Sequence, residues 1–162
     1  MKSYLEIFIV SFESAERVRY ARMAVDISED KRNPDAVVQG LIKAHPGDVP
    51  VVIDNKYISH STSWRYEHNG SIYLTYVVYS EHVDFHGART KSLSLHDMDI
   101  PQTDSPERPR PDVIMEKHVL SHGMRHLCHL VKTSPDNTFA GILSPDSRIL
   151  FFRMLPVLAG KI

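Results

Sequence analysis

The chain has 162 residues, of which 42% are hydrophobic and 24% charged. This length and balance suit one hydrophobic core and argue against a disordered or fibrous protein. Lysine and arginine together number 19, against 20 for aspartate and glutamate, so the chain lacks the broad positive field that attracts nucleic acid or anionic lipid. We therefore expect a single soluble domain over residues 1–162 that binds neither nucleic acid nor membrane.

The one cysteine, Cys128, cannot form a disulfide within the chain. Its neighbours Leu127 and Leu130 favour a buried thiol in a reducing compartment over a reactive nucleophile. The longest apolar stretch near the N-terminus, from Ile7 to Val10, is too short for the core of a signal peptide or for a membrane span. These features predict a cytoplasmic protein.

Two elements are expected at the start of the chain. Lys2 to Phe12 is a near-continuous apolar run rich in β-branched and aromatic residues, which predicts a strand in the middle of a sheet. Glu13 to Ile27 has the composition of a helix. Its arginines Arg17, Arg19 and Arg22 could bind an anion, although a solvated helix face has the same pattern and is the interpretation we favour.

The next helix has the clearest start signal. Asn33 can cap the first turn and Pro34 fits its first position. The following apolar residues form one stripe, and His45-Pro46-Gly47 predicts the end of the helix. Val49 to Ile53 is then a candidate for a short buried strand.

A β-hairpin is predicted from Lys56 to Ser80, because Asn69-Gly70 suits a two-residue type I′ turn between two strand-like runs. That turn places Trp64 opposite Thr75. It gathers polar-tipped aromatic residues on one face, which we interpret as a ligand pocket or partner surface, although a core with bonded hydroxyl groups is the commoner outcome. The candidate ligand-binding residues are His60, Trp64, Tyr66, Tyr73 and Tyr79.

The remaining chain divides at a proline-rich stretch. Thr90 to Asp97 is a further strand candidate, and residues 101–112 contain four prolines in a polar context, which predicts a linker. The tail, residues 113–162, is expected to form a helix from Val113 to Lys132 followed by the apolar run Ile149 to Leu158. It is too short for a core of its own, so it must pack on the body, residues 1–100, or on another copy.

These elements predict the α+β class: a mixed or antiparallel sheet centred on the 57–80 hairpin, packed by helices, with a C-terminal helix after the proline-rich linker. We also expect a homo-oligomer. The tail that follows the proline-rich linker is apolar, and we expect that covering it requires surface from a second copy of the chain.

Ten histidines are the unusual feature of the composition. At the helical repeat, His118, His122, His126 and His129 share one side of the tail helix, opposite Leu120, Met124 and Leu127. The spacing of four residues could let two imidazoles share a metal ion. A solvated, pH-sensitive face or an oligomer contact is the interpretation we favour.

A second group of possible ligands follows the hairpin. His82, Asp84 and His86 alternate, so an extended strand would direct two imidazoles and a carboxylate to one side. Together with His122 they could hold a divalent transition metal, since two histidines and a carboxylate are the ligand set of non-haem iron sites. A polar loop at the end of a strand explains the same residues.

The sequence contains no Walker loop, dinucleotide fingerprint, paired C-x-x-C motif, calcium loop or kinase signature. We identify no known family from its motifs. The leading hypothesis is a non-enzymatic accessory module that binds a small molecule or protein partner. The alternative is a metal-dependent enzyme, either a hydrolase or a non-haem oxygenase, that uses the His/Asp cluster.

Overall fold

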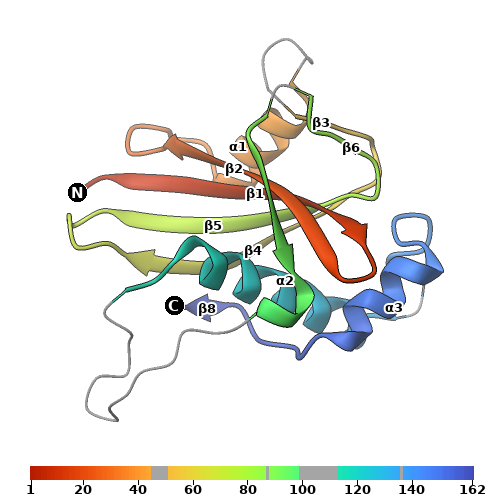
Figure 1. Cartoon of the computed structure of the whole chain (residues 1–162). Coiled ribbons are helices and arrows are strands. Elements are labelled where there is room, and N and C mark those ends of the chain that lie inside the picture. The colour runs from red at the N-terminus through yellow and green to blue at the C-terminus, as the bar shows by residue number, and fades with distance from the viewer. Residues whose placement is uncertain (45–50, 87, 99–112, 136) are drawn as a thin grey trace.

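The computed structural model describes residues 1–44, 51–86, 88–98, 113–135 and 137–162. Six strands form a mixed sheet in the order β7-β2-β1-β5-β4-β8 (Figure 1). The strands are β1 Ser3–Ser14, β2 Arg17–Asp26, β4 Ile58–Tyr66, β5 Ile72–Tyr79, β7 Thr90–Ser94 and β8 Gly160–Lys161. A small second sheet pairs β3 Val52–Ile53 with β6 Val83–Asp84, and the helices are α1 Pro34–Ile42, α2 Glu116–Thr133 and α3 Pro145–Arg153. The predicted α+β class is therefore confirmed.

The apolar run at the N-terminus lies in the middle of the sheet, as predicted. β1 pairs with β2 on one side in antiparallel orientation and with β5 on the other in parallel orientation. The six residues from Leu5 to Val10 are all buried. Alternate side chains of this run enter two different cores, because both faces of the sheet are covered.

The helix predicted for Glu13 to Ile27 is wrong, because this segment contains the end of β1, the β1–β2 turn and strand β2. From Arg17 to Tyr20 the side chains alternate: Arg17 and Arg19 are exposed, whereas Val18 and Tyr20 are buried. This alternation is the period of a strand with one covered face. Pairing with the adjacent β1 therefore outweighs the helix-forming composition of the segment.

The hairpin of β4 and β5 forms where it is predicted, but its register is wrong by one residue. Trp64 pairs with Leu74 instead of Thr75. The hairpin loop has three residues, 68–70, because the N–H of Glu67 donates to the carbonyl of Ser71 at 2.9 Å. Within the loop, the N–H of Gly70 donates to the carbonyl of Glu67 at 3.0 Å. Within this loop only Gly70 has a positive φ, of 79°, whereas a type I′ turn also requires one at Asn69.

A bulge at Thr62, between the pairs of Ser61 and Ser63, shifts the register of β4 a second time. The two shifts divide the predicted aromatic face. Tyr73 and Tyr79 lie on the same face of the sheet as α2, whereas Trp64 points with Leu74 to the opposite face.

Helix α1 covers one face of the sheet and α2 the other (Figure 1). The start of α1 is confirmed, because the Asn33 side chain accepts a hydrogen bond from the N–H of Ala36 at 3.1 Å and Pro34 is the first helical residue. Val37 and Val38 are its buried residues. The predicted stop at residues 45–47 lies outside the described residues.

The tail packs on the body, with α2 lying against β4 and β5. The approach is so close that a Cβ atom on Gly123 would overlap Cγ2 of Val77 and lie 3.3 Å from the Thr62 hydroxyl. Helix α3 and the C-terminal segment, defined here as Met154–Ile162, then pack along α2. Strand β8, within the C-terminal segment, pairs with Ser63 and Trp64 of β4 and so extends the sheet.

Two further predictions can be compared with the fold. Of the strand predicted for 49–53, the described residues form only the two-residue strand β3. The strand predicted for 90–97 ends at Ser94, and a 3-10 turn, Leu95–Asp97, follows it. The proline-rich stretch, 101–112, lies outside the described residues. None of the described helices is long and apolar enough to cross a lipid bilayer.

Candidate functional site

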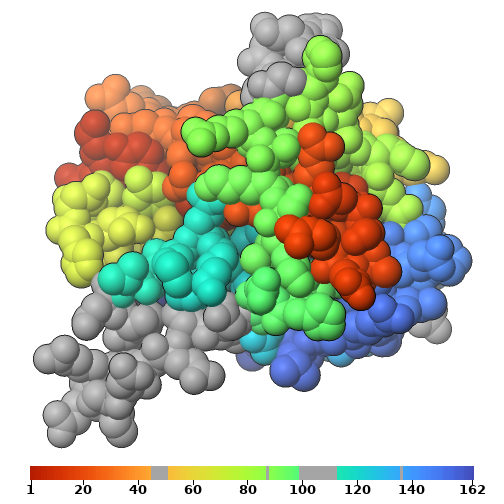
Figure 2. Space-filling view, in the orientation of Figure 1, coloured from red at the N-terminus to blue at the C-terminus, as the bar shows by residue number. Residues whose placement is uncertain are grey.

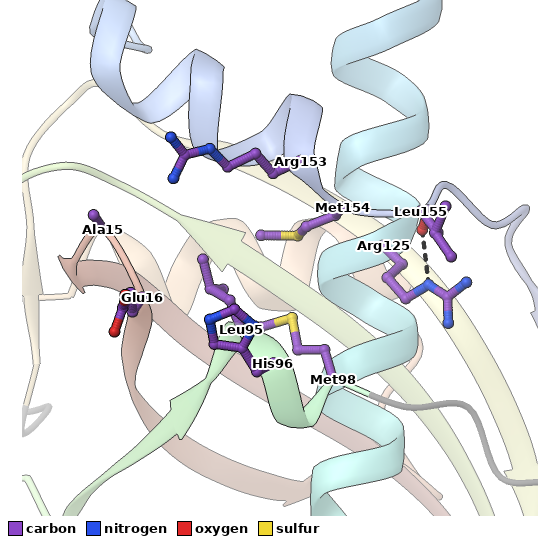
Figure 3. Close-up of a pocket in the computed structure, with 9 residues that line it drawn as sticks. All are labelled: Ala15, Glu16, Leu95, His96, Met98, Arg125, Arg153, Met154 and Leu155. Atoms are coloured by element: carbon purple, nitrogen blue, oxygen red, sulfur yellow. Dashed lines mark hydrogen bonds between the residues drawn. The ribbon is translucent and has the colours of Figure 1, made fainter.

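A cavity of about 340 Å³ lies where the β1–β2 turn, the 3-10 turn, α2 and the end of α3 meet. Figure 3 shows the side chains of Met98 and Met154 facing the same space from the 3-10 turn and from the end of α3. The complete lining consists of Ala15, Glu16, Leu95, His96, Met98, Arg125, Arg153, Met154 and Leu155. We call this space the methionine cavity.

Hydrogen bonds hold the segments around the methionine cavity together in two pairs. The N–H of Leu95 donates to the carbonyl of Glu16 at 2.8 Å, which fixes the 3-10 turn on the β1–β2 turn. On the opposite wall, Nε of Arg125 donates to the carbonyl of Leu155 at 2.7 Å (Figure 3). The cavity is therefore formed by packed segments of the fold.

The lining combines an apolar interior with positive charge at its rim. Leu95, Met98 and Met154 supply the apolar surface, and two arginines stand beside it, Arg125 on α2 and Arg153 at the end of α3. Neither arginine forms an ion pair with an acidic side chain of the described residues. Their charge is balanced locally only by Glu16 among the lining residues. Such a cavity suits an apolar group that carries a negative charge.

The predicted aromatic ligand face does not form as one surface. Tyr79 is fully buried and donates to the hydroxyl of Ser147 at 3.0 Å, so it belongs to the core. Tyr73 stacks on Tyr4 with ring centroids 4.9 Å apart. Trp64 and Tyr66 are on the opposite face, where Nζ of Lys161 lies 5.0 and 5.6 Å from their ring centroids.

His60 also has a different setting from the predicted one. Its Nδ1 lies 3.2 Å from Nε2 of His126 on α2, and 2.8 Å from the carbonyl of Ser61. Nδ1 of His126 lies 3.1 Å from the carbonyl of Val157. In the tautomer assignment that fits these contacts, His126 donates through Nδ1 to the carbonyl of Val157. The single Nδ1 proton of His60 is then shared between the Ser61 carbonyl and Nε2 of His126. This histidine pair thus joins β4, α2 and the C-terminal segment.

The tail-helix histidines are mostly buried, so the prediction of a partly exposed stripe is wrong. His118, His122 and His126 are each at most 8% exposed, because β4 and the C-terminal segment cover the side of α2 that was expected to face solvent. Burial lowers the pKa of both His122 and His126. The apolar residues Leu120, Met124 and Leu127 are buried as predicted.

The predicted metal ligands lie in different settings. His82, Asp84 and His86 are exposed around the short strand β6, where the Asp84 carboxylate accepts a hydrogen bond from the N–H of His86 at 2.8 Å. His122 is buried on α2. In the described ranges, no group of three or more His, Cys, Asp or Glu side chains is placed to hold one metal ion. The metal site stays a prediction of the sequence.

A buried charge cluster on the α2 face was missed at the level of sequence. Glu6 is 1% exposed in the middle of β1. Its carboxylate accepts hydrogen bonds from Arg65 at 2.6 and 3.2 Å, from Arg22 at 2.7 Å and from Thr75 at 3.0 Å. The available signal was a single glutamate within the apolar run from Leu5 to Val10, which requires a partner when that run is buried.

Electrostatics of the cluster favour the ionised carboxylate. Burial alone raises the pKa of Glu6, but the hydrogen bonds and positive charges of Arg65 and Arg22 outweigh burial and hold it below its ordinary value. Arg65 also donates to Glu67 at 2.8 Å and lies over the ring of Tyr73. The cluster thus links four neighbouring strands of the sheet, β2, β1, β5 and β4.

The thiol of Cys128 has a structural setting, as the sequence suggested. It is fully buried and donates to the carbonyl of Met154 at 3.3 Å. Burial raises its pKa, which keeps it in the unreactive protonated form.

The chain matches no protein-family model, and a search of curated proteins returns no significant match.

Proposed function

We propose that this protein is a non-enzymatic binding module, and that the methionine cavity receives the apolar part of a ligand whose negative charge contacts Arg125 or Arg153, which lie on different sides of the cavity (Figure 3). The observation that carries the proposal is the combination of an apolar interior with two arginines that have no carboxylate partner among the described residues. Charged hydrogen bonds to guanidinium groups are strong and directional.

The size and composition of the cavity support a small ligand. A volume of about 340 Å³ lies within the range of small-molecule sites, which are mainly apolar with a few polar groups at fixed positions. Flexible methionine side chains adapt to ligands of different shape. The described lining contains no hydroxyl or thiol beside His96, so binding is a simpler use of these residues than nucleophilic catalysis.

The experiment uses ¹³C-methyl methionine labelling, because two of the six methionines line the cavity. Octanoate is titrated into the protein, with octanol as the uncharged analogue. We expect saturable shifts of the Met98 and Met154 methyl signals, and weaker binding of octanol. In an Arg125→Gln/Arg153→Gln double variant, affinity for octanoate should fall roughly tenfold or more, since each lost charged hydrogen bond is worth about 1.5–3 kcal/mol, whereas affinity for octanol should change little.

Two further variants make the test specific. Ala15→Trp introduces a large ring at an exposed position of the lining and should block both ligands. Arg32→Gln removes an exposed arginine outside the lining and should leave binding unchanged. Equal shifts at all six methionines, or unchanged octanoate binding in Ala15→Trp, would contradict the proposal.

We also propose that the protein forms a homo-oligomer through its tail. The support is a group of exposed apolar side chains on α3 and the C-terminal segment: Ile149, Phe152, Leu155 and Leu158 are 51–71% exposed. Sedimentation should give a mass above that of the 18.5 kDa chain. A mass of 18.5 kDa that stays constant over a wide concentration range would contradict it.

A further inference from the structure

A second cavity lies on the same sheet face, beside the start of α2. It measures about 240 Å³ and is lined by Tyr20, Arg22, Arg89, Lys91 and Glu116. These residues come from β2, from β7 and the residue before it, and from the first residue of α2. Figure 2 shows the start of α2 (teal) directly beside β7 (green) on the surface of the molecule.

Strand register brings the positive side chains to one face. Tyr20 pairs with Lys91, so both point to the same side of the sheet. Arg22 follows Tyr20 by two residues along β2, and Arg89 precedes Lys91 by two residues, so alternation directs them to that side as well. Three cations therefore meet at one cavity, against a single lining carboxylate.

The hydrogen bonds of Arg22 leave part of its guanidinium available. Arg22 binds Glu6 through Nε at 2.7 Å, and Nε lies 4.0 Å from Glu116. Its two terminal nitrogens donate to no described residue, and neither does the exposed side chain of Arg89. These nitrogens can form the paired N–H donors that planar oxyanions accept.

The one opposing carboxylate is already engaged. Oε1 of Glu116 accepts from the Tyr20 hydroxyl at 2.9 Å and from Nζ of Lys91 at 2.8 Å. The buried Glu6 is likewise satisfied by Arg65 and Thr75 in addition to Arg22. An anion can therefore approach the free nitrogens of Arg22 and Arg89, although the charge of Glu116 weakens its binding.

We propose that the cavity lined by Arg22, Arg89 and Lys91 binds a small oxyanion, the phosphate or carboxylate group of a ligand. This site is separate from the methionine cavity and does not depend on the function proposed there.

The test is a titration of the full-length protein with inorganic phosphate and, separately, with acetate, at constant ionic strength held with chloride. Amide shifts of residues 89–91 and of the first turn of α2 report binding. We expect saturable shifts for at least one anion. Tighter binding of phosphate would identify a phosphate group as the ligand, and tighter binding of acetate would identify a carboxylate.

Three variants separate a specific site from general attraction by charge. Arg89→Gln should weaken binding at least tenfold. Because Arg89 is exposed, the variant should keep its fold, and circular dichroism checks this. Arg19→Gln is the matched control, because Arg19 is on β2 but faces the opposite side of the sheet, over the ring of Phe85. It should leave the affinity unchanged. Glu116→Gln should strengthen binding, because it removes the repelling carboxylate.

The proposal is overturned if neither anion gives saturable shifts. It is also overturned if Arg19→Gln and Arg89→Gln lower the affinity equally, or if Glu116→Gln weakens binding while the fold is retained.

Discussion

Replacing Glu6 by glutamine tests whether the buried charge cluster supports the sheet. The substitution keeps the size of the side chain but removes the negative charge that faces Arg65 and Arg22. The Arg65 side chain is only 6% exposed. The new amide group would place N–H donors against guanidinium donors. Removing one partner of a buried ion pair costs about 3–5 kcal/mol, because the other charge remains buried. For a chain of this length, that corresponds to a fall in Tm of roughly 6–20 °C.

The assay is urea unfolding followed by circular dichroism, with Glu13→Gln as the control. Glu13 forms an exposed ion pair with Arg17 at 3.8 Å, so its loss should cost no more than about 0.5 kcal/mol. The Glu6→Gln/Arg65→Met double variant should lose less stability than the sum of the losses in the two single variants. In the double variant both members of the pair are neutral, so neither is left as a buried charge without its partner. Additive costs, or a Glu6→Gln cost below about 1 kcal/mol, would refute this account.

Three other predictions follow from the packing. Gly123→Ala should cost about 1–3 kcal/mol through overlap with Val77, and adding Val77→Ala should recover part of it; strict additivity in urea unfolding would argue against the overlap. Asn33→Ala should cost about 1 kcal/mol and Asn33→Ser much less; equal costs would mean that the cap is unimportant. Because burial lowers the folded-state pKa of His126, its stabilising contribution is present above about pH 6.5 and is lost as the pH falls. His126→Gln should therefore flatten the stability profile between about pH 7 and 5; unchanged profiles would contradict this.

The sequence predicted correctly those features that are determined by residues close together in the chain. The Asn33 cap, the apolar run of β1 and the turn glycine Gly70 each act within a few residues, and each marks a real feature of the fold. Strand β2 was misjudged because its composition favours a helix while its partner β1 decides its conformation. The register of the hairpin depends on the turn type, and a type I′ turn requires a positive φ at Asn69. The Asn-Gly dipeptide permits this conformation but does not impose it, and Asn69 does not adopt it.

The candidate sites depend on contacts between distant parts of the chain, so the sequence predicted little of them. The methionine cavity joins Ala15, Met98 and Met154, and no periodic pattern relates these positions. His126, the residue after Arg125, is expected on an exposed face but is buried, because a helical projection does not show which segments of the chain cover it. Arg22 was noted only as one of three arginines on an expected helix, and its role with Glu6 follows from strand pairing.

The parallel pairing of β1 with β5 has a consequence for how the chain folds. Ile7 pairs with Tyr76, 69 positions further along the sequence, whereas β1 with β2 and β4 with β5 are hairpins that close locally. The two hairpins can form early, but joining them requires closure of a long loop and is slow. Until they join, the buried strands β1 and β5 each have an open apolar edge. We expect refolding to lose yield to aggregation as protein concentration rises, because such edges pair readily between chains.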